Sequence, residues 1–89
     1  MADLYNGVVS TEWVDASTLA TFTSGNDYFI QNQGLSDVQV YVGTDTPTDT
    51  TREGTIIPVM FQAHFQKGTS DIYIRAKLGT ARINISEAE

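Results

Sequence analysis

The stretch "YFIQNQGLSDVQVYVG", residues 28–43, carries the most regular pattern in the chain. Apolar and polar residues alternate in Tyr28–Asn32 and again in Val38–Val42. Because successive side chains of a β-strand point to opposite faces, this alternation predicts two strands, each with one buried face. The segment between them, Gln33–Ser36, is typical of a turn, since its glycine adopts a positive φ without steric cost. We therefore expect the two strands to form an antiparallel hairpin.

The same alternation recurs near the C-terminus, in "DIYIRA" (Asp71–Ala76) and "TARINIS" (Thr80–Ser86). The glycine-containing Lys77–Thr80 is typical of a turn, so these two strands are expected to form a second hairpin. One face of each strand is aliphatic and should point inward. The predicted core consists of Val38, Val40, Val42, Ile72, Ile74, Ile83 and Ile85.

Between these two regions, the threonine-rich Thr44–Gly54 is predicted to be an exposed loop. The following "GTIIPVMF" (Gly54–Phe61) contains a short strand with Pro58 inside it. Because proline has no N–H to donate, this strand should lie at a sheet edge, carry a bulge or end at the proline. A further alternating run follows in Phe61–Gln66.

Residues 11–23 are open to two interpretations. Trp13, Ala16 and Leu19 fall at helical spacing behind Ser10 or Thr11 as a cap, which predicts a helix. The β-branched and aromatic residues at positions 18 and 21–23 suit strands better, and they favour two short strands joined near residues 15–17. The sequence leaves both alternatives standing, with a slight preference for strands.

These patterns together predict an all-β protein, a small antiparallel β-sandwich or barrel of six to eight short strands. With 89 residues, the chain is expected to form a single domain over residues 1–89. Residues 1–8 and 86–89 are expected to be flexible arms, as chain ends commonly are.

Composition restricts the class of partner. The net charge is −6, which argues against nucleic acid because phosphate binding needs a basic face. No apolar run is long enough to span a bilayer, and the first ten residues lack the basic and apolar regions of a signal peptide. The chain has no cysteine, which fits synthesis in a reducing cytoplasm. We therefore expect neither a nucleic acid nor a membrane as partner.

The sequence offers few groups for catalysis. His64 is the only histidine, so a single chain can build neither a pair of histidine ligands nor an ordinary catalytic triad. Asp45 and Asp49 do not have the spacing of an EF-hand loop, and the glycines are scattered rather than gathered in a phosphate-binding motif. We expect no catalytic residue, no metal site and no cofactor.

Exposed aromatic residues are the remaining candidates for function. Trp13, Tyr41 and Tyr73 are expected on the face opposite the aliphatic positions, together with Arg75. Such residues are enriched in protein interfaces, and an aromatic row can equally stack on sugar rings. We take Trp13, Tyr41, Tyr73 and Arg75 as the candidate interface.

Three segments carry a resemblance to a known group of proteins. They are "YFIQNQG" (residues 28–34), "VQVYV" (residues 38–42) and the final strand "ARINISE" (residues 81–87). This order of strands resembles the short β-structured virion proteins of tailed bacteriophages, over roughly residues 28–87. Members of that group decorate capsids or sit in tails, so the resemblance implies a structural role without catalysis.

The sequence thus leads us to expect a non-enzymatic bacteriophage virion structural protein. A capsid decoration or stabilising protein is preferred, made in the host cytoplasm and assembled on the virion. Its expected partners are copies of itself, as a homotrimer or homodimer, and other virion proteins such as the major capsid protein. The alternative is a carbohydrate-binding or tail-associated host-attachment module, with a glycan as partner.

Overall fold

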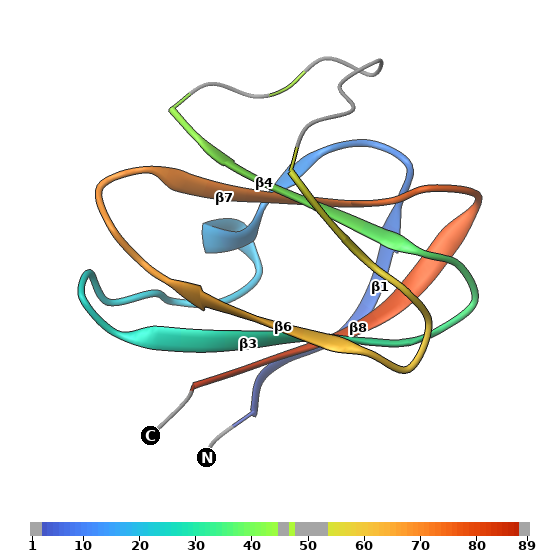
Figure 1. The fold of residues 1–89 in the computed structure, drawn as a ribbon, viewed down its shortest axis with the longest axis horizontal. Helices are drawn as coiled ribbons and strands as arrows, with labels where there is room; N and C mark the ends of the chain where they lie inside the picture. The colour runs from blue at the N-terminus through green and yellow to red at the C-terminus, as the bar shows by residue number, and fades with distance from the viewer. Residues whose placement is uncertain (1–2, 45–46, 48–53, 88–89) are drawn as a thin grey trace.

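The computed structural model describes residues 3–44, 47 and 54–87 and confirms an all-β protein (Figure 1). All strand pairs are antiparallel, and they form two sheets of four strands. A single 3-10 turn, η1 (Ala16–Thr18), is the only helical element in these described residues. The strands are β1 (Asp3–Ser10), β2 (Val14–Asp15), β3 (Asp27–Gly34), β4 (Val38–Gly43), β5 (Thr55–Ile57), β6 (Gln62–Gln66), β7 (Asp71–Ala76) and β8 (Thr80–Glu87).

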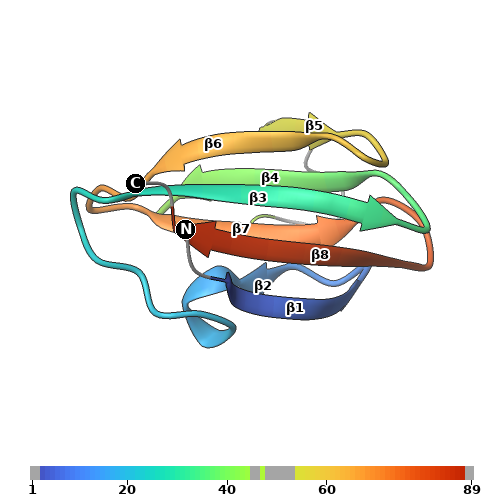
Figure 2. The same cartoon turned by 90° about the horizontal axis from the view of Figure 1, so that it is seen from below.

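The two sheets stack as the layers of a sandwich. The first sheet has the strand order β1-β8-β3-β6 and the second has β2-β7-β4-β5. Figure 2 looks onto the first sheet, whose strands lie side by side in that order with the second sheet behind them. The architecture is therefore the small antiparallel β-sandwich that the alternation predicted.

Both predicted hairpins are wrong. β3 lies in the first sheet and β4 in the second, while β7 lies in the second and β8 in the first. Each connection is a β-arch, which carries the chain from one sheet to the other. Alternation shows which face of a strand is buried, but two strands with one buried face each can lie side by side or face each other across the core. Here they face each other.

The arch between β3 and β4 is organised by Asn32, which is fully buried at the end of β3. Its Nδ2 donates to the carbonyl oxygens of Ser36 at 2.8 Å and Ile57 at 2.9 Å. Its Oδ1 accepts a hydrogen bond from the backbone N–H of Gly34 at 3.0 Å. One amide therefore joins the first sheet to β5 of the second and closes the turn. The backbone reverses through positive φ angles at Gly34 and Leu35.

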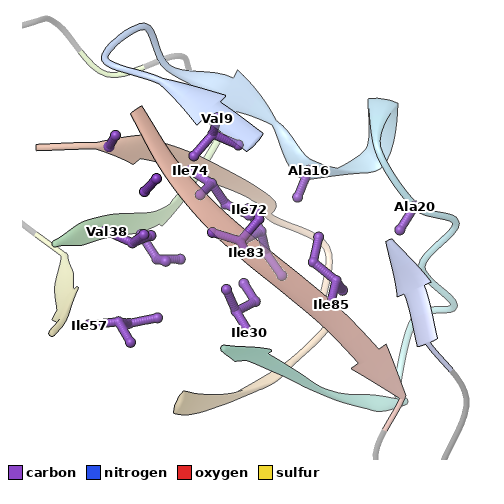
Figure 3. Packing of buried hydrophobic residues seen from close by; sticks show 13 residues of the cluster. Val9, Ala16, Ala20, Ile30, Val38, Ile57, Ile72, Ile74, Ile83 and Ile85 are labelled. Atoms are coloured by element: carbon purple, nitrogen blue, oxygen red, sulfur yellow. The ribbon is translucent and has the colours of Figure 1, made fainter. Parts of the chain in front are cut away.

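The core lies between the two sheets (Figure 3). Six of the seven predicted core residues are buried, and Val42 is the exception at 49% exposed. β5 is only three residues long and pairs with β4 no further than Val40, so it leaves the end of β4 uncovered. Residues that the prediction omitted complete the core, chiefly Val9, Ile30, Ile57 and Ala81.

Residues 11–23 match neither interpretation in full. Val14 and Asp15 form a single short strand, β2, which pairs with β7. The Asp15 carboxylate then accepts a hydrogen bond from the Ser17 N–H at 2.9 Å and starts η1. The N-cap starts one helical turn, and the β-branched and aromatic residues at positions 18 and 21–23 do not favour its continuation. The second predicted strand does not form.

The expected arms also need correction. Asp3–Ser10 forms β1, which pairs with β8 along its length, and Ser86 and Glu87 belong to β8. Tyr5 and Val9 of β1 face the core, and this burial explains why the segment is part of the sandwich. Pro58 behaves as expected, because β5 is an edge strand that ends at Ile57.

Replacing Asn32 tests the organisation of the arch. Asn32→Ala removes three hydrogen bonds and leaves buried backbone groups without partners, so we expect the free energy of unfolding to fall by about 2–4 kcal/mol. Urea denaturation followed by circular dichroism measures it. Gln33→Ala, at the exposed neighbouring position, should change stability by less than about 0.5 kcal/mol. Equal effects of the two variants would contradict the role given to Asn32.

Candidate functional site

The four predicted interface residues come together on the outer face of the second sheet. In the register, Tyr41 of β4 lies opposite Tyr73 of β7, and Gln39 lies opposite Arg75. The alternate residues of both strands are buried in the core, so these four side chains point outward. Trp13, which directly precedes β2, joins them. We call Trp13, Gln39, Tyr41, Tyr73 and Arg75 the tryptophan–arginine cluster.

Contacts within the tryptophan–arginine cluster are close. The Arg75 guanidinium carbon lies 4.6 Å from the centre of the Trp13 ring, a cation–π contact. Its Nε donates to Gln39 Oε1 at 2.9 Å. The Tyr41 ring meets Trp13 edge-on, with 6.3 Å between the centroids. Although they point outward, Gln39 is fully buried and Arg75 is 9% exposed.

The tryptophan–arginine cluster is thus a packed layer on the sheet rather than a row of free aromatic rings. Tyr73 is buried, and its hydroxyl donates a long 3.5 Å hydrogen bond to the Asp71 carboxylate. Arg75 covers one face of the Trp13 ring, so a sugar ring cannot stack on that face. Trp13 and Tyr41 are half-buried, so part of each ring lies at the surface.

Trp13 also lines a cavity of about 250 Å³ at the side of the sandwich. Val8 and Val9 of β1 form one wall, and Val14 and Leu19 form another. The cavity lies where the edge strands of the two sheets, β1 and β2, leave the layers open. Ser10, Glu12 and Trp13 complete the lining, so the recess offers polar groups as well as aliphatic ones.

A second surface was missed by the sequence analysis. Large apolar side chains are exposed at one end of the sandwich: Leu35 at 72%, Met60 at 72%, Phe61 at 63% and Leu78 at 77%. They lie on the connections β3–β4, β5–β6 and β7–β8, which gather at the end away from the chain termini (Figures 1 and 2). Val59 adds to them at a lower exposure. We call Leu35, Val59, Met60, Phe61 and Leu78 the apolar tip.

Backbone hydrogen bonds hold the three connections of the apolar tip together. Asn32 exchanges two of them with the β5–β6 connection: its N–H donates to the Phe61 carbonyl, and its own carbonyl accepts from the Met60 N–H, both at 2.9 Å. The Lys77 N–H donates to the Asp37 carbonyl at 2.8 Å and so links the other two arches. The apolar tip is therefore built on a braced framework.

Two residues of the apolar tip adopt a backbone conformation that their side chains disfavour. Leu35 has a φ of 82° and Met60 a φ of 75°. A left-handed conformation costs a non-glycine residue roughly 1–2 kcal/mol. Bulky apolar residues that are both strained and exposed contribute little to folding, and such positions concentrate at functional sites.

A sequence signal for the apolar tip did exist. Leu35 stands beside Gly34, Leu78 stands beside Gly79, and residues 59–61 follow Pro58 directly. Turn residues are usually polar because turns lie at the surface. Leucine, methionine and phenylalanine within turns therefore indicate a surface kept apolar for contact.

Groups for acid–base or metal chemistry are sparse on the surface. His64 lies on the outer face of the first sheet, where its Nε2 is 3.4 Å from Asp27 Oδ2. Both side chains are about half exposed, and an exposed pair of this kind contributes little to stability. Among residues 3–44, 47 and 54–87, no three histidine, aspartate or glutamate side chains gather as metal ligands would. Asp45 and Asp49 lie outside the described residues.

No protein-family model, no curated protein and no solved structure matches the chain. Among the residues that the structure describes, no helix has the length and hydrophobicity to cross a bilayer. The geometry of the two surfaces, the tryptophan–arginine cluster and the apolar tip, therefore carries the functional argument.

Arg75 provides a test of the tryptophan–arginine cluster. Arg75→Lys keeps the charge but removes the Nε donor and the planar group over Trp13, so we expect a loss of about 2 kcal/mol in the free energy of unfolding. Trp13 is the only tryptophan, so the fluorescence emission should shift in the folded variant. Lys77→Arg, an exchange at an exposed position, serves as the control. An Arg75→Lys variant with unchanged emission and stability would contradict the packed arrangement.

Proposed function

We propose that this protein is a non-enzymatic structural protein of a bacteriophage virion, which decorates and stabilises the capsid. The observation that carries the proposal is the apolar tip, a braced end of the sandwich with four side chains more than 60% exposed. The resemblance of residues 28–87 to phage virion proteins supports the same class of structural protein. The role needs binding and rigidity and requires no catalytic group.

Energetics favour the apolar tip as the main contact. Burying one large aliphatic or aromatic side chain contributes about 1.5–3 kcal/mol, so four of them supply most of what a stable contact needs. The hydrogen bonds between the arches fix their backbone before binding, which lowers the entropy lost on association. The major capsid protein, presented many times on the particle, is the partner that we propose for this end.

Contacts between copies of the chain are proposed for the sides of the sandwich. The edge strands β1 and β2 flank the cavity beside Trp13, and the half-buried Tyr41 lies next to it. A neighbouring copy that fills this cavity would bury aliphatic surface on both chains. We propose a homotrimer or homodimer assembled in this way, with Trp13 and Tyr41 in the contact and Tyr73 and Arg75 supporting them.

Co-sedimentation with capsids tests the proposal. The partner is an empty head made from the major capsid protein encoded beside the gene of this protein. We expect saturable binding that Phe61→Ser together with Leu78→Ser reduces at least about tenfold, because both exposed anchors are removed. Ile56→Ser, at an exposed apolar position of β5 outside the apolar tip, is the matched control. Metabolic genes as neighbours, or binding that does not depend on Phe61 and Leu78, would refute the proposal.

A variant of Met60 tests whether this residue serves capsid binding rather than the stability of the fold. Met60→Gly relieves a positive φ of 75° at an exposed site, so we expect the free energy of unfolding to stay unchanged or to rise by up to about 1 kcal/mol. The same variant should bind capsids several times more weakly. Urea denaturation and co-sedimentation measure the two effects. A variant that is much less stable would show that Met60 serves folding, which contradicts its assignment to the contact.

A further inference from the structure

The outer face of the first sheet carries a row of side-chain amides that crosses all four strands. In the register, Asn6 of β1 lies opposite Asn84 of β8, Asn84 opposite Gln31 of β3, and Gln31 opposite Gln62 of β6. The flanking residues of β8 and β3 are buried in the core, so these amides point outward. Neighbouring strands are about 4.8 Å apart, and the amides therefore recur at about that spacing.

Most of the hydrogen-bonding capacity of this row is unused. Within the described residues, the one side-chain hydrogen bond of the row is accepted by Gln31 Oε1, from Gln33 Nε2 at 3.3 Å. Asn84 is only 7% exposed, yet no fully buried side-chain nitrogen or oxygen in this part of the chain lacks a partner. The amide atoms of Asn84 therefore keep some contact with solvent, although the residue is nearly covered by its neighbours.

A second row beside the amides adds an aromatic ring. It runs from Ser86 of β8 to Phe29 of β3 and His64 of β6. Phe29 is half-buried, and its ring lies 5.4 Å from the His64 imidazole. Ser86 is buried like Asn84, and its hydroxyl keeps only slight contact with solvent. The face thus combines the Phe29 ring and the His64 imidazole with neutral groups that both donate and accept, and the Asp27 carboxylate lies at its end beside His64.

We infer that this surface, the amide face of Asn6, Phe29, Gln31, Gln62 and Asn84, binds a neutral carbohydrate chain lying across the strands. A sugar hydroxyl both donates and accepts hydrogen bonds, and so does a side-chain amide. The apolar side of a pyranose ring packs on an aromatic ring such as Phe29. Sugar units along an extended polysaccharide repeat at a distance close to the strand spacing of about 5 Å.

Charge favours a neutral carbohydrate over other classes of ligand for the amide face. The amide row carries no charge, and the net charge of −6 disfavours anionic glycans and nucleic acids. A protein partner would be expected to use large apolar side chains, which the apolar tip offers and the amide face largely lacks. The tryptophan–arginine cluster is less suited to sugar, since Arg75 covers one face of its indole ring. This inference is independent of the role proposed for the apolar tip.

Affinity gel electrophoresis tests the inference with the full chain. Native gels contain dextran, mannan or hydroxyethyl cellulose, and we expect retardation by at least one of them. Titration calorimetry with that polysaccharide should show a Kd at least about tenfold higher for the double variant Gln31→Ala/Gln62→Ala, which removes two amides of the row. Phe29→Ala should weaken binding in the same direction.

Controls keep the outcome unambiguous. Ile56→Ser, at an exposed position of β5 in the other sheet, should bind the polysaccharide as the unchanged protein does, and circular dichroism should show that each variant is folded. Retardation by none of the three polysaccharides would overturn the inference, as would binding that survives the loss of both glutamines. Binding abolished by Trp13→Phe would place the sugar on the tryptophan–arginine cluster and overturn it too. Capsid binding, measured in parallel, should not change in the amide variants.

Discussion

The structure depends on two aliphatic faces that must meet across one core. β3 and β8 supply one face and β4 and β7 the other, and each of these strands points its core side chains inward at alternate positions. Apart from β4 and β5, which pair within the second sheet, strands that follow one another along the chain lie in opposite sheets. Three connections, β3–β4, β5–β6 and β7–β8, pass between the layers at the same end. The apolar tip is a product of this arrangement, since it is made of the turns that cross there.

Much of the fold was predictable because burial with a period of two appears directly in the sequence. Ile72, Ile74, Ile83 and Ile85 are buried as expected, and β5 ends before Pro58 because of the missing N–H. Pairing was not predictable in the same way. The hydrogen bonds of Asn32 to Ser36 and Ile57 decide that β3–β4 is an arch, and they join residues that local patterns do not connect.

The candidate surfaces, like the fold, were predictable only in part. Alternation predicts that Tyr41, Tyr73 and Arg75 point outward, and Trp13 joins them because it directly precedes β2. The close packing of these side chains cannot be predicted from alternation. It depends on the register that sets Gln39 beside Arg75 across two strands. The apolar tip was not predicted because a turn pattern indicates where the backbone reverses and does not show that the exposed side chains of Leu35 and Leu78 gather at one end. The amide face needs the pairing of all four strands, which no single segment reveals.

The pairing of β1 with β8 has a further consequence. Asp3 lies opposite Ser86, so the beginning of β1 and the end of β8 are neighbours in one sheet. A short linker could join them, and the polypeptide could then be reopened elsewhere as a circular permutant. For the same reason the whole unit could be grafted into a surface loop of an unrelated scaffold. The grafted unit would point its crossing turns away from the host, as a ready-made display module.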